Sequence, residues 1–136
     1  MNSPSPAALK NARCADIMQP AACIVDPDFT CERTFQSMAA TRSRFAAVVV
    51  DGALAGLVTI GDFARLRGRD PASLFLGAIM TPAKDLITLA PQTIALDALR
   101  ALDESHVHQM PVLSAGRKLE GFITRETLMS LGAWDE

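Results

Sequence analysis

The chain of 136 residues contains the same two motifs twice. Residues 16–20 (DIMQP) return 62 positions later as residues 78–82 (AIMTP), and residues 56–59 (GLVT) return 65 positions later as residues 121–124 (GFIT). Two copies are too few for a repeat array, and a unit of about 60 residues buries little core alone. We therefore expect two α+β units that pack about an approximate two-fold axis, with a small-ligand site at their seam.

Each copy shows the pattern β-α-β-β-α. In the first copy, residues 24–25 predict a short strand, Thr30 an N-cap, residues 45–50 a buried strand, and Asp51-Gly52 a tight turn. The first copy then continues with a return strand over 55–59 and a helix over 61–66. In the second copy, the predicted elements are a strand over 86–87, a helix after Pro91, a hairpin over 110–113 and 119–124, and a helix over 127–131.

The domain boundaries follow from the repeat. Residues 1–13, rich in Pro, Ser and Asn, predict a flexible lead-in or a short strap. Residues 14–70 form the first repeat and residues 71–136 the second, including a connection in which Leu74, Phe75 and Leu76 are expected to face the body.

Composition excludes several classes of function. The net charge of −2 gives no drive toward nucleic acid or acidic membranes, so Arg65, Arg67 and Arg69 are interpreted as a solvated helix end or a phosphate rim. No apolar run reaches 18 residues and no export signal is visible, which predicts a cytoplasmic protein without a membrane segment.

Metal and covalent chemistry have little support in the sequence. Three cysteines, all in the first half and without C-x-x-C spacing, predict reduced, packed thiols and no disulfide. His106 and His108 have a spacing that suits a metal on a strand, but an exposed corner between helix and strand is favoured, and we expect no metal. No nucleophile has a plausible paired base, so we expect no enzyme activity.

The strongest candidate site lies where the first GLVT motif ends. The predicted strand ends and the next helix begins at Thr59, so its hydroxyl and the free amides of Ile60 and Gly61 are expected to face a phosphate. Asp62 is an acceptor-only group that suits a pair of ribose hydroxyls, and Arg44 can neutralise a phosphate. The alternative is that Thr59 and Asp62 simply cap the helix.

The repeated motifs resemble those of the cystathionine-β-synthase (CBS) domain, and two in tandem resemble a Bateman module. The resemblance rests on I-M-x-P at the head of each copy, on G-x-x-T-x-x-D over 56–62 and its counterpart over 121–127, and on Pro111-Val112 in the middle strand. It covers about residues 14 to 132. It implies a regulatory fold that binds AMP, ADP, ATP or S-adenosylmethionine in clefts between the repeats.

The resemblance also implies further site residues. The adenine base is expected in a nook formed by residues 81–87 of the other repeat's head, with Thr81 at its start and Leu86 and Ile87 as apolar walls. The second cleft has Thr127 where an acid is expected, which removes bidentate ribose recognition and weakens the site. Phosphate contacts in that cleft remain possible from the side chains Thr124, Arg125 and His108.

The function expected from the sequence is a non-catalytic regulatory module. It would bind an adenine nucleotide, require no cofactor, form a homodimer through its helices, and signal to a separate protein effector. The alternative is a scaffold or dimerisation module whose clefts stay empty. The sequence favours neither a membrane nor a nucleic-acid partner.

Overall fold

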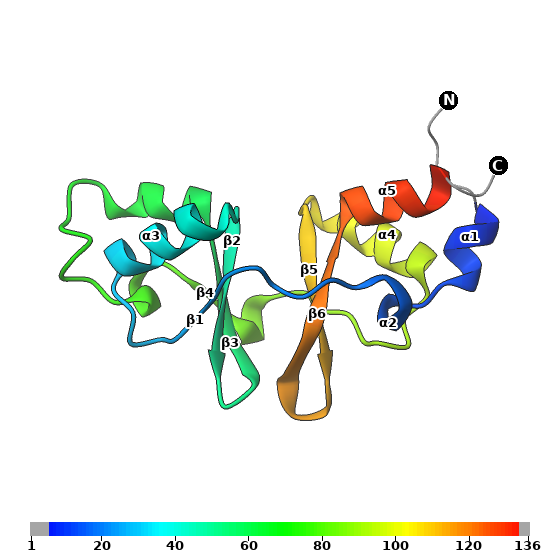
Figure 1. Ribbon diagram of the computed structural model, residues 1–136, viewed down its shortest axis with the longest axis horizontal. Coiled ribbons are helices and arrows are strands. Elements are labelled where there is room, and N and C mark those ends of the chain that lie inside the picture. Colours follow the sequence, from blue (N-terminus) through cyan, green and yellow to red (C-terminus); the bar gives the residue numbers. More distant parts are fainter. Residues whose placement is uncertain (1–5, 134–136) are drawn as a thin grey trace. The chain divides into compact units, whose positions relative to one another are not determined.

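A computed structural model describes residues 6–133 of the chain (Figure 1). The fold is a mixture of α-helices, short 3₁₀ helices and mainly antiparallel β-strands, which confirms the predicted α+β class. The chain divides into two compact units. Unit 1 combines the N-terminal segment up to Pro20 with the C-terminal part from Ile87, and unit 2 is the continuous stretch Ala21–Leu86.

Unit 2 is built around the first predicted hairpin. Its elements are β1 (Ile24–Val25), α3 (Cys31–Thr41), β2 (Phe45–Val50), β3 (Ala53–Thr59), η1 (Ile60–Leu66), η2 (Leu76–Ala78), β4 (Thr81–Pro82) and η3 (Ala83–Asp85). Strand β1 pairs parallel with β2, which pairs antiparallel with β3, and β4 pairs antiparallel with β3. The β2–β3 turn has positive φ at Asp51 (52°) and Gly52 (82°), which confirms the turn expected from that dipeptide.

Local hydrogen bonding and backbone conformation determine where helix α3 begins and ends. Thr30 is its N-cap, because the Thr30 hydroxyl accepts a hydrogen bond from the Arg33 N–H at 3.1 Å. The helix ends at Arg42, which has the left-handed conformation common at helix ends. Its buried side chains Cys31 and Met38 belong to the core of unit 2. In the sequence, Cys31, Phe35, Met38 and Ala39 share one apolar helix face, which predicts that Phe35 is buried, but its side chain is 52% exposed.

The connection between the repeats supplies part of the core of unit 2. Leu76 is completely buried and Leu74 packs beside the same core, as predicted, whereas Phe75 is 60% exposed. The reason is local: Phe75 is in an extended conformation that forms a bridge with Thr30, so its neighbours in the chain point the opposite way.

The predicted strand over residues 86–87 is wrong. Residues 83–85 form the 3₁₀ helix η3 and Ile87 is exposed, while the buried residue that pairs with the next hairpin is Leu89. Leu89 forms a parallel bridge with Val112, just as Val25 pairs with Val48 in unit 2. The β-branched side chain of Ile87 indicated a strand, but burial and pairing fall two residues later.

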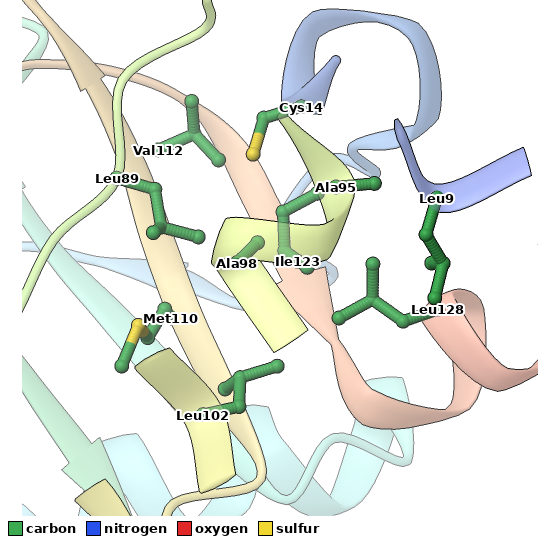
Figure 2. Close-up of a cluster of buried hydrophobic side chains, with 10 residues drawn as sticks. All are labelled: Leu9, Cys14, Leu89, Ala95, Ala98, Leu102, Met110, Val112, Ile123 and Leu128. Carbon is green, nitrogen blue, oxygen red and sulfur yellow. The ribbon is translucent and has the colours of Figure 1, made fainter. Parts of the chain in front are cut away.

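Unit 1 repeats the plan with a different N-terminal element. Its elements are α1 (Pro6–Asn11), α2 (Cys14–Ile17), α4 (Ala95–Ser105), β5 (Gln109–Ser114), η4 (Ala115–Arg117), β6 (Lys118–Thr124) and α5 (Arg125–Ala133). Strands β5 and β6 pair antiparallel, as predicted. Figure 2 shows the core, in which buried side chains from α1, α4, β5, β6 and α5 converge.

Residues 6–13 belong to the N-terminal segment for which the sequence predicted a flexible lead-in or a short strap. Residues 6–11 form α1, which packs against α4 and α5, and Leu9 is buried beside Leu128 (Figure 2). Residues 1–5 lie outside the described part of the chain. The segment that follows is also fixed, because the Cys14 N–H donates to the Thr93 carbonyl at 2.8 Å and the Ala95 N–H to the Ala12 carbonyl at 2.8 Å.

The I-M-x-P head of each repeat packs against the hairpin of the other repeat. In unit 2, a Cβ added at Gly56 would lie 2.8 Å from the sulfur of Met80 and 2.8 Å from the carbonyl oxygen of Thr81. In unit 1, a Cβ at Gly121 would lie 3.0 Å from the carbonyl oxygen of Gln19. Glycine in the repeated G-x-x-T motif therefore makes room for the backbone of the head segment.

This close approach predicts the effect of substituting Gly56. Gly56→Ala should lower the free energy of unfolding by about 1–3 kcal/mol, because the new methyl group overlaps a backbone carbonyl that is held in the sheet. Gly77→Ala is the matched control, since nothing lies within 4 Å of a Cβ there. Urea unfolding of the two variants measures the difference, and equal stability would contradict the proposed crowding.

Candidate functional site

The candidate site lies at the end of β3 in unit 2. Thr59 is the last residue of this strand and pairs with Phe45 on β2. The Ile60 N–H donates to the carbonyl oxygen of Arg44 at 3.1 Å. The sheet register therefore brings Arg44, whose side chain is exposed, beside the Thr59–Asp62 segment, as the sequence predicted.

Asp62 lies in the first turn of η1 and is nearly buried. Only 8% of its surface is exposed, and its Oδ2 accepts a hydrogen bond from the Thr59 N–H at 2.8 Å. Its Oδ1 lies 3.8 Å from Nη2 of Arg65, whose own side chain is 62% exposed. One carboxylate oxygen thus caps the helix start, while the other has only a long contact with a solvated guanidinium.

Two details of the predicted phosphate cradle are corrected. The amide of Ile60 is not free, because the Arg44 carbonyl oxygen accepts its hydrogen bond. The helix predicted over 61–66 is a 3₁₀ helix over Ile60–Leu66, which has poorer hydrogen-bond geometry than an α-helix. Phosphate binding here would depend more on Arg44 and on the Thr59 hydroxyl.

The residues expected to hold the base are divided between the units. Thr81 on β4 pairs with Leu57, two residues before Thr59 on β3, so both lie in unit 2. Leu86 is half-buried in the same unit, and its N–H donates to the Ala83 carbonyl at 3.1 Å. Ile87 is the first residue of the second stretch of unit 1 and is 56% exposed.

The equivalent positions of the second repeat form a different cluster in unit 1. Thr127 stands at the position of Asp62, and its hydroxyl lies 3.0 Å from the Thr124 hydroxyl. Arg125 forms an ion pair with Asp103 on α4, and the Arg125 N–H donates to the His108 carbonyl at 3.1 Å. With Arg125 committed to Asp103 and no carboxylate at position 127, this cluster lacks the ribose acceptor of unit 2.

The remaining reactive side chains are shielded or solvated. Cys14, Cys23 and Cys31 are free thiols in the two cores, and burial raises the pKa of Cys14 to about 11. Burial also raises the pKa of Cys23 and Cys31. His106 ends α4 with a left-handed backbone, and both histidines are exposed, so they form the corner between helix and strand that the sequence favoured.

Sequence reasoning missed two partners at these sites. Arg65 next to Asp62 and Asp103 next to Arg125 each form an ion pair with a predicted site residue. The first has a local signal, since Asp62 and Arg65 are three residues apart and share a helix face. The second joins two helices 22 residues apart, and no local pattern indicates it.

Comparison with known families identifies the two repeats. The model of the CBS domain matches residues 14–69 and again residues 76–133. The chain belongs to the CBS domain family. Its two CBS domains stand in tandem over most of its length, which confirms the resemblance drawn from the repeated motifs.

Solved CBS domain pairs share this fold. The CBS domain pair of protein MJ0100, in complex with 5′-methylthioadenosine and S-adenosyl-L-methionine, has a TM-score of 0.77 at 17% identity and covers 92% of this chain and 98% of its own. CBSX2 in complex with AMP has a TM-score of 0.78 at 23% identity, covering 88% and 95%. A CBS domain from a membrane protein of Sphaerobacter thermophilus has a TM-score of 0.75 at 24% identity, covering 92% and 90%.

A curated relative is similar over part of the sequence. The mitochondrial CBS domain-containing protein CBSX3 of Arabidopsis thaliana is 36% identical over 64 residues, which are 45% of this chain and 31% of that protein. The chain thus matches about a third of the relative's length. Within residues 6–133, no helix is long and apolar enough to cross a bilayer. The cytoplasmic location expected from the sequence stays a prediction.

Proposed function

We propose that this CBS domain pair is a non-catalytic regulatory module that binds one adenine nucleotide of the AMP, ADP or ATP class in unit 2. The observation that carries the proposal is the nearly buried carboxylate of Asp62, which has one oxygen fixed by the Thr59 N–H and the other in long contact with Arg65. Complexes of CBS domain pairs of similar fold with AMP and with S-adenosyl ligands support an adenosine-type ligand.

Asp62 is suited to the ribose. Its Oδ1 can accept from a ribose hydroxyl once the solvated Arg65 side chain turns away, and Oδ2 keeps a second lone pair while it caps η1. A charge-assisted hydrogen bond of this kind contributes about 1.5–3 kcal/mol. The carboxylate is rigid because the Thr59 N–H holds it, which lowers the entropy cost of binding.

Arg44, Thr59 and Gly61 would bind the phosphates. The exposed Arg44 guanidinium supplies a fork of donors beside the strand end, and the Thr59 hydroxyl and the Gly61 amide add neutral donors. The base would lie against the head of the second repeat, where Thr81 and Leu86 belong to the same unit as Asp62. The ligand would thus contact both repeats, and its binding would be transmitted to a separate protein effector.

A scaffold function is the second candidate, and a specific observation favours it. The hydrogen bond from the Thr59 N–H to Asp62 is a helix-capping arrangement that needs no ligand. If Asp62 serves only as a cap, the module would act by dimerisation alone. Ligand binding decides between the two functions.

Thermal unfolding in the presence of adenine nucleotides tests the proposal. A ligand at one hundred times its dissociation constant should add about 2.7 kcal/mol, which raises the melting temperature by several degrees for a domain of this size. The measurement is a thermal-shift panel of AMP, ADP, ATP, NAD and S-adenosylmethionine, with guanosine monophosphate as a control for the base. If no adenine ligand shifts the melt at millimolar concentration, the scaffold function is the correct one.

A substitution at Asp62 separates recognition from folding. Asp62→Asn keeps the carbonyl oxygen that can accept from the Thr59 N–H, so the free energy of unfolding should fall by at most about 1 kcal/mol. Nucleotide affinity should fall tenfold or more, because the anionic acceptor for the ribose is gone. Asp51→Asn, at an exposed acid in the β2–β3 turn of the same unit, is the charge-matched control in calorimetric titrations. An unchanged affinity together with a much lower melting temperature would make Asp62 a structural cap.

A further inference from the structure

Asp62 has a cation of its own chain beside the oxygen that the proposed ribose contact needs. Its Oδ2 accepts from the Thr59 N–H at 2.8 Å, whereas its Oδ1 lies 3.8 Å from Nη2 of Arg65. Within residues 6–133, Arg65 is the one cation that forms an ion pair with Asp62. The carboxylate is nearly buried, so its charge would be unfavourable in an empty site without a neighbouring cation.

The helix type explains why these two side chains meet. A 3₁₀ helix has three residues per turn, so the side chains three residues apart, Asp62 and Arg65 on η1, lie directly above one another. In an α-helix the same pair would be offset by about 60° around the axis. The helix then ends at Arg67, which has a left-handed backbone with φ of 46°. Arg65 is therefore the arginine of this segment that η1 directs toward the carboxylate.

The second repeat lacks both members of the pair. The offset between the two exit motifs places Thr127 at the position of Asp62 and Ser130 at the position of Arg65. The Thr127 hydroxyl lies 3.0 Å from the Thr124 hydroxyl and is uncharged, so it needs no cation. The acid and the arginine thus occur together in one copy and are replaced together in the other, as expected if Arg65 serves Asp62.

We propose that Arg65 is an internal competitor of the ligand. Its guanidinium neutralises Asp62 in the empty site and leaves Oδ1 when a ribose hydroxyl binds there. The contact can open readily, because 3.8 Å exceeds hydrogen-bond length and the Arg65 side chain is 62% exposed. This inference rests on the proposed function, since it needs a ribose at Asp62, and it makes Arg65 a residue that sets the affinity of the site.

Adenosine is the probe that isolates this competition. It has the ribose but no phosphate, so its affinity does not depend on attraction between an arginine and a phosphate. Arg65→Met keeps an unbranched side chain but removes the charge and the N–H donors. We expect this variant to bind adenosine about twofold to fivefold more tightly in calorimetric titrations, which is the range for loss of an exposed ion pair. Its melting temperature without ligand should fall slightly, because Asp62 loses its cation.

A matched control and ionic strength distinguish competition from a structural role. Arg69→Met removes another exposed arginine of unit 2, one that forms no ion pair within residues 6–133, and it should leave adenosine affinity unchanged. Raising the salt concentration from about 0.01 M to 1 M shortens the screening length from about 30 Å to 3 Å. Salt therefore weakens the Asp62–Arg65 contact, and the difference in adenosine affinity between the parent protein and Arg65→Met should shrink.

Parallel titrations of adenosine and AMP separate failure of this inference from failure of the proposed function. Equal adenosine affinity in the parent and Arg65→Met would overturn the inference alone. Unchanged adenosine affinity with weaker AMP binding would also overturn it, since Arg65 would then bind phosphate. Binding of neither ligand to either protein would overturn both, because no ribose would reach Asp62. Binding to Arg65→Met but not to the parent would support the competition and reject nucleotide binding by the unmodified chain.

Discussion

A fragment of residues 21–86 should be several kcal/mol more stable than a fragment of residues 14–70. The first fragment is the whole of unit 2, including Leu76 and Ile79, which are completely buried in its core. The second corresponds to the first sequence repeat but lacks both side chains and strand β4. Loss of each buried aliphatic side chain costs about 2–5 kcal/mol, and a small domain has only about 5–15 kcal/mol of total stability.

Circular dichroism and amide hydrogen exchange on the two purified fragments test this expectation. The 21–86 fragment should unfold cooperatively and protect the β2–β3 amides, while the 14–70 fragment should show neither property. Residues 14–20 cannot stabilise the second fragment, because their partners include Thr93 and Phe122 of unit 1. If the 14–70 fragment is the more stable of the two, the division into units described above is wrong.

Leu76→Ala should be among the most destabilising single substitutions in the connecting segment. Its side chain is completely buried, so truncation removes apolar contacts and leaves a cavity, at a cost of about 2–5 kcal/mol. The adjacent Phe75→Ala removes a larger side chain that is 60% exposed, and it should change stability by less than about 0.5 kcal/mol. Urea unfolding of the full-length variants compares the two changes directly.

A large loss of stability in Phe75→Ala would contradict this expectation. If Phe75→Ala costs as much as Leu76→Ala, then Phe75 is buried by a contact outside its own unit, such as a second copy. A concentration-dependent loss for Phe75→Ala would identify that contact as intermolecular.

Elements with local chemical signals could be predicted from the sequence. Asp51-Gly52 and Thr30 determine a turn and a helix start through their own backbone preferences and hydrogen bonds, and the structure confirms both. Leu89 could not be identified in this way, because its pairing with Val112 depends on a strand 23 residues away. The same limit applies to Phe35, which fits an apolar helical stripe but is 52% exposed and contacts Phe63 of η1 edge to face.

The sequence indicated where the candidate site residues lie, but not which hydrogen bonds their atoms form. The motif indicated Thr59 and Asp62, and the place of Arg44 before the neighbouring strand indicated Arg44. The structure brings the three together near the end of β3, and their binding role stays a prediction. The motif could not show that the Arg44 carbonyl takes the Ile60 N–H, or that Asp62 Oδ2 accepts from the Thr59 N–H. These bonds arise from the tertiary register and from a 3₁₀ rather than an α-helical turn.

The exchange of heads between the repeats affects how the protein forms during translation. Unit 2 is continuous, so every contact within it becomes available once Leu86 has left the ribosome. The segment that ends at Pro20 is made first, but its backbone partner Phe122 is among the last residues to be made. Domains generally fold as units while the chain is still growing, so we expect the middle of this chain to fold before its beginning.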